Sequence, residues 1–118
     1  MNYLCLDYGV KHIGVAIATS PLADPLATYD TKDILRKMPE LIKNHDIHKI
    51  IIGNCPEDFL NKIKELGREV ILVDETLTTV DATKALFHTT KSRRKAQIHA
   101  VSAAIILQSY LDLGVEKP

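Results

Sequence analysis

Residues 3–18 read YLCLDYGVKHIGVAIA, and the architecture follows from how this segment pairs with itself and with later runs. Two apolar runs, 3–6 and 13–18, flank a short segment that contains Gly9. Apolar runs of about five residues around a glycine-bearing turn predict a β-hairpin. Asp7 follows the first run directly, so a carboxylate is expected at the carboxyl end of the first strand.

Three further apolar runs predict more strands. A weak strand is indicated at 26–29, after two prolines. The β-branched run 47–53 ends in glycine and is typical of a strand buried on both faces. The run 70–73 predicts another short buried strand. With the hairpin, these runs make five strands.

Helical spacing of apolar residues separates these strands. It predicts a helix over 32–45, in which Pro39 implies a kink or a late start. A second helix is expected from Pro56 to the closing Gly67, and a long one over about 95–113. A hairpin followed by strand–helix units indicates an α/β fold, a mixed sheet with helices on both faces.

Length and composition narrow the class of protein. The chain has 118 residues with 15 basic and 15 acidic side chains, which favours a single domain over 1–118. No apolar stretch approaches a membrane span, and the amino terminus does not resemble a secretory signal. Cys5 and Cys55 lie in or beside apolar runs, as reduced thiols do. We therefore expect a soluble cytoplasmic protein that does not bind membranes.

Two acidic residues follow predicted strands. Asp7 ends the first strand, and Glu75, after Asp74, follows the strand at 70–73. Ligands of such sheets collect at the carboxyl ends of the parallel strands. Two carboxylates at that edge repel each other unless a cation lies between them, and oxygen ligands suit Mg²⁺ or Mn²⁺. The alternative interpretation is that these acids only begin a turn or cap a helix.

Positive charge gathers near the carboxyl-terminal helix. Residues 82–111 contain no acid, and they include the cluster Lys91-Ser92-Arg93-Arg94-Lys95. The helical pattern breaks at about 89–94, so we expect this cluster to lie largely in a loop. Such a loop can neutralise phosphates, with Ser92 as a further hydrogen-bond donor. It can equally be a solvated basic loop, or a set of cations at a helix end.

One of the five histidines stands out by position. His99 opens the last predicted helix on the face that continues with Ala103, Ile106 and Tyr110. An imidazole there is either a packed boundary residue or a metal ligand, if the helix covers the strand ends. The other four histidines, at positions 12, 45, 48 and 88, are assigned no role.

Several blocks, in order, resemble the YqgF family, also called RuvX-like. The similar blocks are residues 4–16, residues 51–56, Asp74-Glu75-Thr76-Leu77-Thr78-Thr79-Val80-Asp81-Ala82 and residues 102–112. They span nearly the whole chain. The resemblance implies a ribonuclease-H-like fold and two-metal hydrolysis of nucleic-acid phosphodiesters. Family members are described as nucleases for the 5′ end of pre-16S ribosomal RNA, and earlier as Holliday junction resolvases.

The resemblance also implies roles for individual residues. Asp7 and Glu75 match the first two catalytic, metal-binding acids, and the third falls on His99. Imidazole is a poorer ligand for Mg²⁺ than for Mn²⁺, so this departure favours Mn²⁺. A second departure is Thr76, where the family usually has arginine. The expected phosphate contacts are Lys11 and the cluster Lys91, Ser92, Arg93, Arg94 and Lys95.

Three functions remain open at this point. We expect the chain to be an endonuclease that cleaves precursor ribosomal RNA. This RNA is either free or held by the ribosome or its small-subunit precursor. The first alternative is a resolvase of branched DNA. The second is a nucleic-acid-binding protein with weak or no catalysis, because His99 replaces an acid. Either a monomer or a homodimer fits the sequence.

Overall fold

The computed structural model describes residues 2–19, 22–73 and 91–112, with side chains from residue 99 onward in the last range. The strands are β1 (Tyr3–Asp7), β2 (His12–Ala18), β3 (Asp24–Asp30), β4 (Lys49–Ile52) and β5 (Glu69–Leu72). The helices are α1 (Thr31–His45), α2 (Glu57–Lys64) and α4 (Lys91–Asp112).

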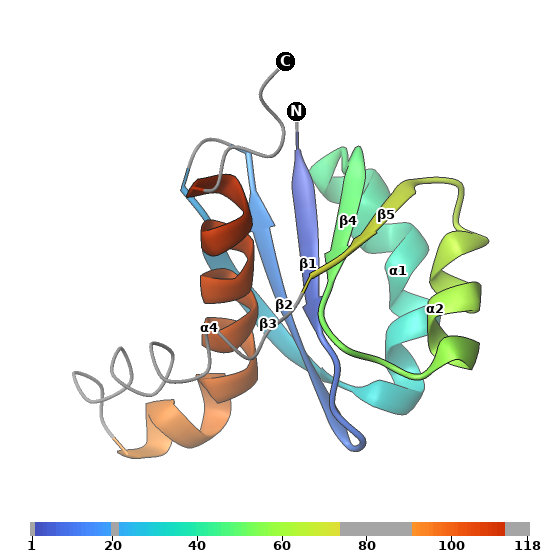
Figure 1. Ribbon diagram of the computed structural model, residues 1–118. Coiled ribbons are helices and arrows are strands. Elements are labelled where there is room, and N and C mark those ends of the chain that lie inside the picture. Colours follow the sequence, from blue (N-terminus) through green and yellow to red (C-terminus); the bar gives the residue numbers. More distant parts are fainter. Residues whose placement is uncertain (1, 20–21, 74–90, 113–118) are drawn as a thin grey trace.

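The five strands form one mixed sheet in the order β3-β2-β1-β4-β5. β1 pairs antiparallel with β2, and β2 with β3, whereas β4 and β5 run parallel to β1. Figure 1 shows α1 and α2 on one face of the sheet and α4 on the other. The predicted mixed sheet with helices on both faces is confirmed.

Large aliphatic side chains fill the face under α1 and α2. Alternate residues of the central strands point to this side because successive strand residues face opposite ways. They meet the buried apolar stripes of the two helices. The fully buried members of this cluster include Leu4, Leu6, Ile13, Val15, Ile34, Met38, Ile50, Ile52 and Ile63. Each such side chain contributes about 1.5–3 kcal/mol when it is removed from water.

The face under α4 is packed with smaller residues. Ala16 and Ala18 of β2 contact a helix face that contains Ala103 and Ala104. Larger side chains fill the far end of this layer. There the rings of Tyr3 and Tyr110 meet edge to face, with centroids 6.1 Å apart. Small residues let a helix backbone approach a strand closely, and this approach matters for the site.

Two sequence expectations need correction. α1 begins at Thr31 and runs through Pro39, so a late start is wrong. Pro39 is exposed, and proline has no N–H to donate to the Leu35 carbonyl one turn earlier. β5 is not fully buried: Leu72 is 56% exposed, because β5 is the last strand of the sheet order.

The last helix also differs from the prediction. α4 begins at Lys91, not near Lys95, so the basic cluster 91–95 lies in its first turns instead of a loop. The helix has no acid in its first turn. Cations at this end oppose the helix dipole, an arrangement that a bound anion would relieve. None of the helices within the three described ranges has the length and apolar character needed to cross a membrane.

Candidate nucleic-acid cleavage site

The turn between β1 and β2 is tied to the start of α1. The Thr31 hydroxyl donates a hydrogen bond to the Gly9 carbonyl at 2.6 Å, and the Thr31 N–H donates to the Lys11 carbonyl at 2.9 Å. A side chain on Gly9 would overlap the His12 carbonyl, so glycine is required in this tight turn. These contacts hold the residues that follow Asp7 in one conformation.

Asp7, Gly14 and Thr28 form one row across three strands. Gly14 of β2 pairs with Asp7 on one side and with Thr28 on the other. Tyr3 and Cys5 belong to the core under α4, so alternation along β1 places Asp7 on the same face. The Thr28 hydroxyl is buried and has no hydrogen-bond partner among the residues that the structure describes. The row thus carries a carboxylate and an unpaired hydroxyl under α4.

α4 lies directly on this row at Gly14. A Cβ on Gly14 would overlap the carbonyl carbon and oxygen of His99, and would crowd the Ala100 nitrogen. Only glycine allows this approach of helix backbone to strand. The contact places His99 over the cross-strand neighbour of Asp7, at the carboxyl end of β1. Asp7 and the backbone of His99 thus lie at the same end of the sheet.

A second histidine reaches His99. The ring centroids of His12 and His99 are 5.9 Å apart, with planes inclined by 39°. On its other side, His12 Nδ1 lies 3.4 Å from an Asp30 carboxylate oxygen. Burial lowers the pKa of His99 below its ordinary value, and the nearby His12 ring lowers it further by electrostatic repulsion. The lowered pKa favours the neutral imidazole, the form that binds metal ions.

A hollow of about 360 Å³ opens beside His12. It is lined by Val10, Lys11, His12, Asp30 and Lys32. Lys11 and Lys32 are exposed, so their ammonium groups are accessible to an anionic ligand. Lys11 was predicted as a phosphate contact, whereas Lys32 and His12 were not identified from the sequence. Strand alternation puts His12, two residues before Gly14, on the same face, but it does not reveal that His12 lies near His99.

The remaining predicted site residues are not placed. Glu75 lies outside the described residues, and so does Thr76. For Lys91, Ser92, Arg93, Arg94 and Lys95, the structure gives the helical backbone and no side-chain positions. Within the described ranges, no three His, Cys, Asp or Glu side chains are grouped closely enough to hold a metal ion together. The metal-binding roles of Asp7, Glu75 and His99 stay predictions.

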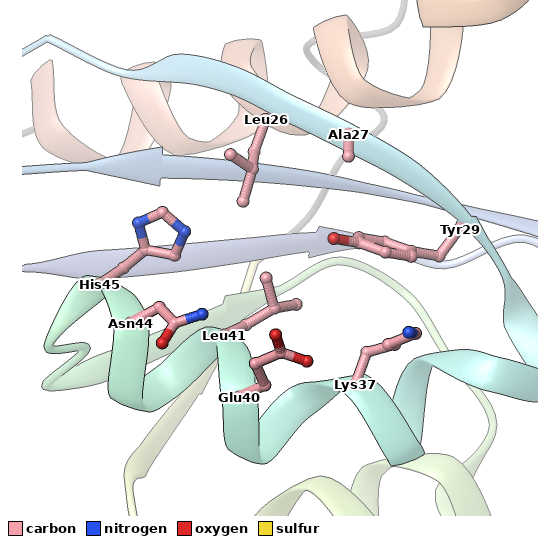
Figure 2. Close-up of a pocket in the computed structure, with 8 residues that line it drawn as sticks. All are labelled: Leu26, Ala27, Tyr29, Lys37, Glu40, Leu41, Asn44 and His45. Carbon is pink, nitrogen blue, oxygen red and sulfur yellow. The ribbon is translucent and has the colours of Figure 1, made fainter.

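A separate hollow of about 410 Å³ lies on the opposite face of the sheet, between β3 and α1. Figure 2 shows Leu26 and Leu41 within it, with His45 at one end and Tyr29 at the other. Glu40 is the one acidic residue among those that line this hollow. A single carboxylate offers little for a divalent ion, so this hollow is a weaker candidate site than the α4 face.

Known proteins resemble this chain over most of its length. A curated relative from Sulfurihydrogenibium sp. (strain YO3AOP1) is 35% identical, over 92% of this chain and 88% of its own. One from Ruminiclostridium cellulolyticum is 34% identical, over 95% and 94% respectively. Both are named "Putative pre-16S rRNA nuclease".

Solved structures share the fold at low sequence identity. RuvC from T. thermophilus, solved in complex with a Holliday junction substrate, has a TM-score of 0.57 at 14% identity, over 97% of this chain and 96% of its own. The Fowlpox virus resolvase, solved with Holliday junction DNA, has a TM-score of 0.61 at 15% identity, over 98% and 99%. These neighbours establish a ribonuclease-H-like, RuvC-type fold.

The family model agrees with the relatives. The model of RuvX, described as a Holliday junction resolvase, matches residues 54–113, which include α2, β5 and α4. Together with relatives that are more than 30% identical over almost the entire chain, this match identifies the chain as a member of the RuvX family.

Proposed function

We propose that the protein is a metal-dependent endonuclease that cleaves structured RNA, in the maturation of the 5′ end of pre-16S ribosomal RNA. Its curated relatives bear the name of a nuclease with this substrate. The observation that carries the proposal is the placement of Asp7 at the carboxyl end of β1, on the face where α4 brings His99 against Gly14.

The proposed site combines carboxylate and imidazole donors. Asp7 and His99 would hold a divalent cation together with Glu75, and the lowered pKa of His99 favours the neutral imidazole that this role needs. This donor set fits Mn²⁺ better than Mg²⁺, because imidazole is a softer ligand than carboxylate oxygen. When bound, such a cation stabilises the charge that develops on a phosphodiester and activates a water molecule for attack.

The chain's own groups position the substrate. Lys11 and Lys32 beside the 360 Å³ hollow would bind backbone phosphates, and the basic first turns of α4 would extend this contact. Contacts to phosphates fix the orientation of the bound nucleic acid and do not read its base sequence. The proposed enzyme therefore recognises the shape of a folded nucleic acid, in agreement with a structured RNA substrate.

A cleavage assay tests this proposal. The purified chain is incubated with a precursor ribosomal RNA and with a four-way DNA junction, with Mn²⁺ or Mg²⁺ in turn. We expect RNA cleavage that is faster with Mn²⁺ and that Asp7→Asn reduces by at least 100-fold. Asp58→Asn is the matched control, since Asp58 is an exposed residue of α2 on the opposite face.

Each other outcome of the assay identifies a different function. Cleavage of the junction alone would support a branched-DNA resolvase, the function in the description of the family model. Binding of either substrate without cleavage under any metal condition would contradict the enzyme. It would favour a binding protein that has lost activity through His99.

A further inference from the structure

We propose that Val10, in the turn between β1 and β2, packs against an unpaired nucleotide of the RNA, so that the protein prefers such a site to continuous duplex. This inference rests on the proposed nucleic-acid substrate and adds to it a contact with a base. Val10 is 87% exposed, more than Leu22 or Leu72, the other exposed large apolar side chains in the described ranges.

The turn holds Val10 in one place. The residues on either side of it are both tied to Thr31: the Gly9 carbonyl accepts from the Thr31 hydroxyl at 2.6 Å, and the Lys11 carbonyl accepts from the Thr31 N–H at 2.9 Å. Val10 is therefore ordered before any ligand arrives, and little conformational entropy is lost when a ligand covers it. An apolar side chain held in water in this way gains free energy when a ligand removes it from water.

The groups around Val10 suit a nucleic-acid strand. Val10 lines the 360 Å³ hollow together with Lys11 and Lys32, whose ammonium groups can bind phosphates. Asp30 is the one acid in this lining, and its carboxylate lies 3.4 Å from His12 Nδ1. A strand whose phosphates contact the two lysines brings its sugars and bases to the apolar side chain between them.

The chemistry of valine selects an unpaired base and not a base identity. Its side chain has no hydrogen-bonding group, so it can cover the face of a base and cannot read the donors and acceptors on its edges. In a continuous duplex the base faces are already covered by stacking, whereas bases in loops and bulges are free to pack on a protein side chain. Apolar side chains that enter opened base steps are a known mode of nucleic-acid binding.

The chain also limits where that nucleotide lies. Val10 follows Asp7 by three residues, so their Cα atoms are at most about 10 Å apart. Successive nucleotides of one duplex strand rise by about 3.4 Å. The unpaired nucleotide should therefore lie within about three nucleotides of the bond cleaved at the proposed site.

Binding titrations of the metal-free full chain test the inference without cleavage. The probes are a continuous RNA duplex and the same duplex with one bulged nucleotide. We expect wild type to bind the bulged RNA about 10-fold more tightly, the effect of burying roughly one valine side chain. Val10→Ser should lose this preference and bind the continuous duplex as wild type does. Val10→Ile, which keeps an apolar β-branched side chain, should retain it.

Two control variants separate this contact from charge and from general surface apolarity. Lys11→Gln should weaken binding of both RNAs alike and reduce the slope of log affinity against log salt by about 1, whereas Val10→Ser should leave that slope unchanged. Leu22→Ser removes an exposed apolar side chain between β2 and β3, at the end of the sheet away from the β1–β2 turn (Figure 1). It should change neither affinity.

Equal affinity of wild type for the two RNAs would overturn the inference, and so would a preference that Val10→Ser keeps. Circular dichroism checks that each variant is folded. Methyl NMR spectra of the wild type need no variant: the bulged RNA should shift the Val10 methyl signals more than the continuous duplex does, and should leave those of Leu22 in place. Val10 signals that respond to neither RNA would contradict the proposal.

The titrations and the cleavage assay fail independently. A Val10-dependent preference for bulged RNA in a chain that cuts no nucleic acid would support this inference and contradict the proposed nuclease. Cleavage that Asp7→Asn abolishes, together with RNA binding that Val10→Ser leaves unchanged, would support the nuclease and contradict the role of Val10.

Discussion

The sheet face under α1 and α2 is filled by large aliphatic side chains, whereas the face under α4 is lined beside the site by glycine and alanine. Neighbouring residues of β2 show the contrast. Ile13 is fully buried in the first layer, and Gly14 lets the α4 backbone touch the strand on the second. The first layer is suited to stabilising the fold. The second is suited to placing the His99 backbone accurately beside the row that carries Asp7.

Substitution of the two neighbours should separate stability from function. Ile13→Ala removes a fully buried side chain and should lower the free energy of unfolding by about 2–5 kcal/mol. Gly14→Ala should cost about 1–3 kcal/mol, because its Cβ meets backbone that must shift. Urea unfolding measures both. Per folded molecule, Ile13→Ala should keep its cleavage rate, and Gly14→Ala should lose at least 10-fold. Equal cleavage losses would remove the distinction between the two faces.

Two threonines near the site should respond in opposite directions. Thr28→Val replaces a buried hydroxyl that has no partner in the described part of the chain, so we expect the free energy of unfolding to rise by about 1 kcal/mol. Thr31→Val removes the hydroxyl that donates a hydrogen bond to the Gly9 carbonyl, so the free energy of unfolding should fall by about 1 kcal/mol. Thermal and urea unfolding give the sign of each change. A loss of stability in Thr28→Val would show that its hydroxyl has a partner in solution.

The smallest expected effect is on the pH dependence of stability. The pKa of His99 is lowered below 6.5 by burial and then by His12, so the unfolded chain binds more protons between the folded and unfolded pKa values. Stability of the metal-free chain should therefore rise with pH up to about 6.5 and level off above it. His99→Asn should flatten this rise. An identical pH profile in the variant would mean that His99 is not desolvated.

Much of the fold could be predicted from the sequence, because the signals were local. The hairpin around Gly9 and the β-branched run of β4 match simple patterns of apolar alternation and burial. The errors concern tertiary context. Burial of β5 depends on its place at the sheet edge, and the start of α4 at Lys91 could not be read from periodicity in a run of charged residues.

The site was only partly predictable. Strand direction assigned Asp7 to the carboxyl end of the first strand, and the resemblance to the RuvX family implied that His99 belongs to the same site. His12 was missed, because its nearness to His99 depends on how closely α4 approaches Gly14. That approach is a contact between residues 85 positions apart, and no local pattern encodes it. The role of Glu75 stays a prediction.

The most direct test of the account is a map of where a paramagnetic ion sits on the folded chain. Substoichiometric Mn²⁺ is added to the ¹⁵N-labelled, metal-free protein, and the broadening of each amide signal is measured. We predict strong broadening at Asp7, Gly14 and His99, and none at Ile34 and Met38 in the layer under α1. Broadening confined to the α1 side, or sharp signals at both Asp7 and His99, would contradict a metal site beneath α4.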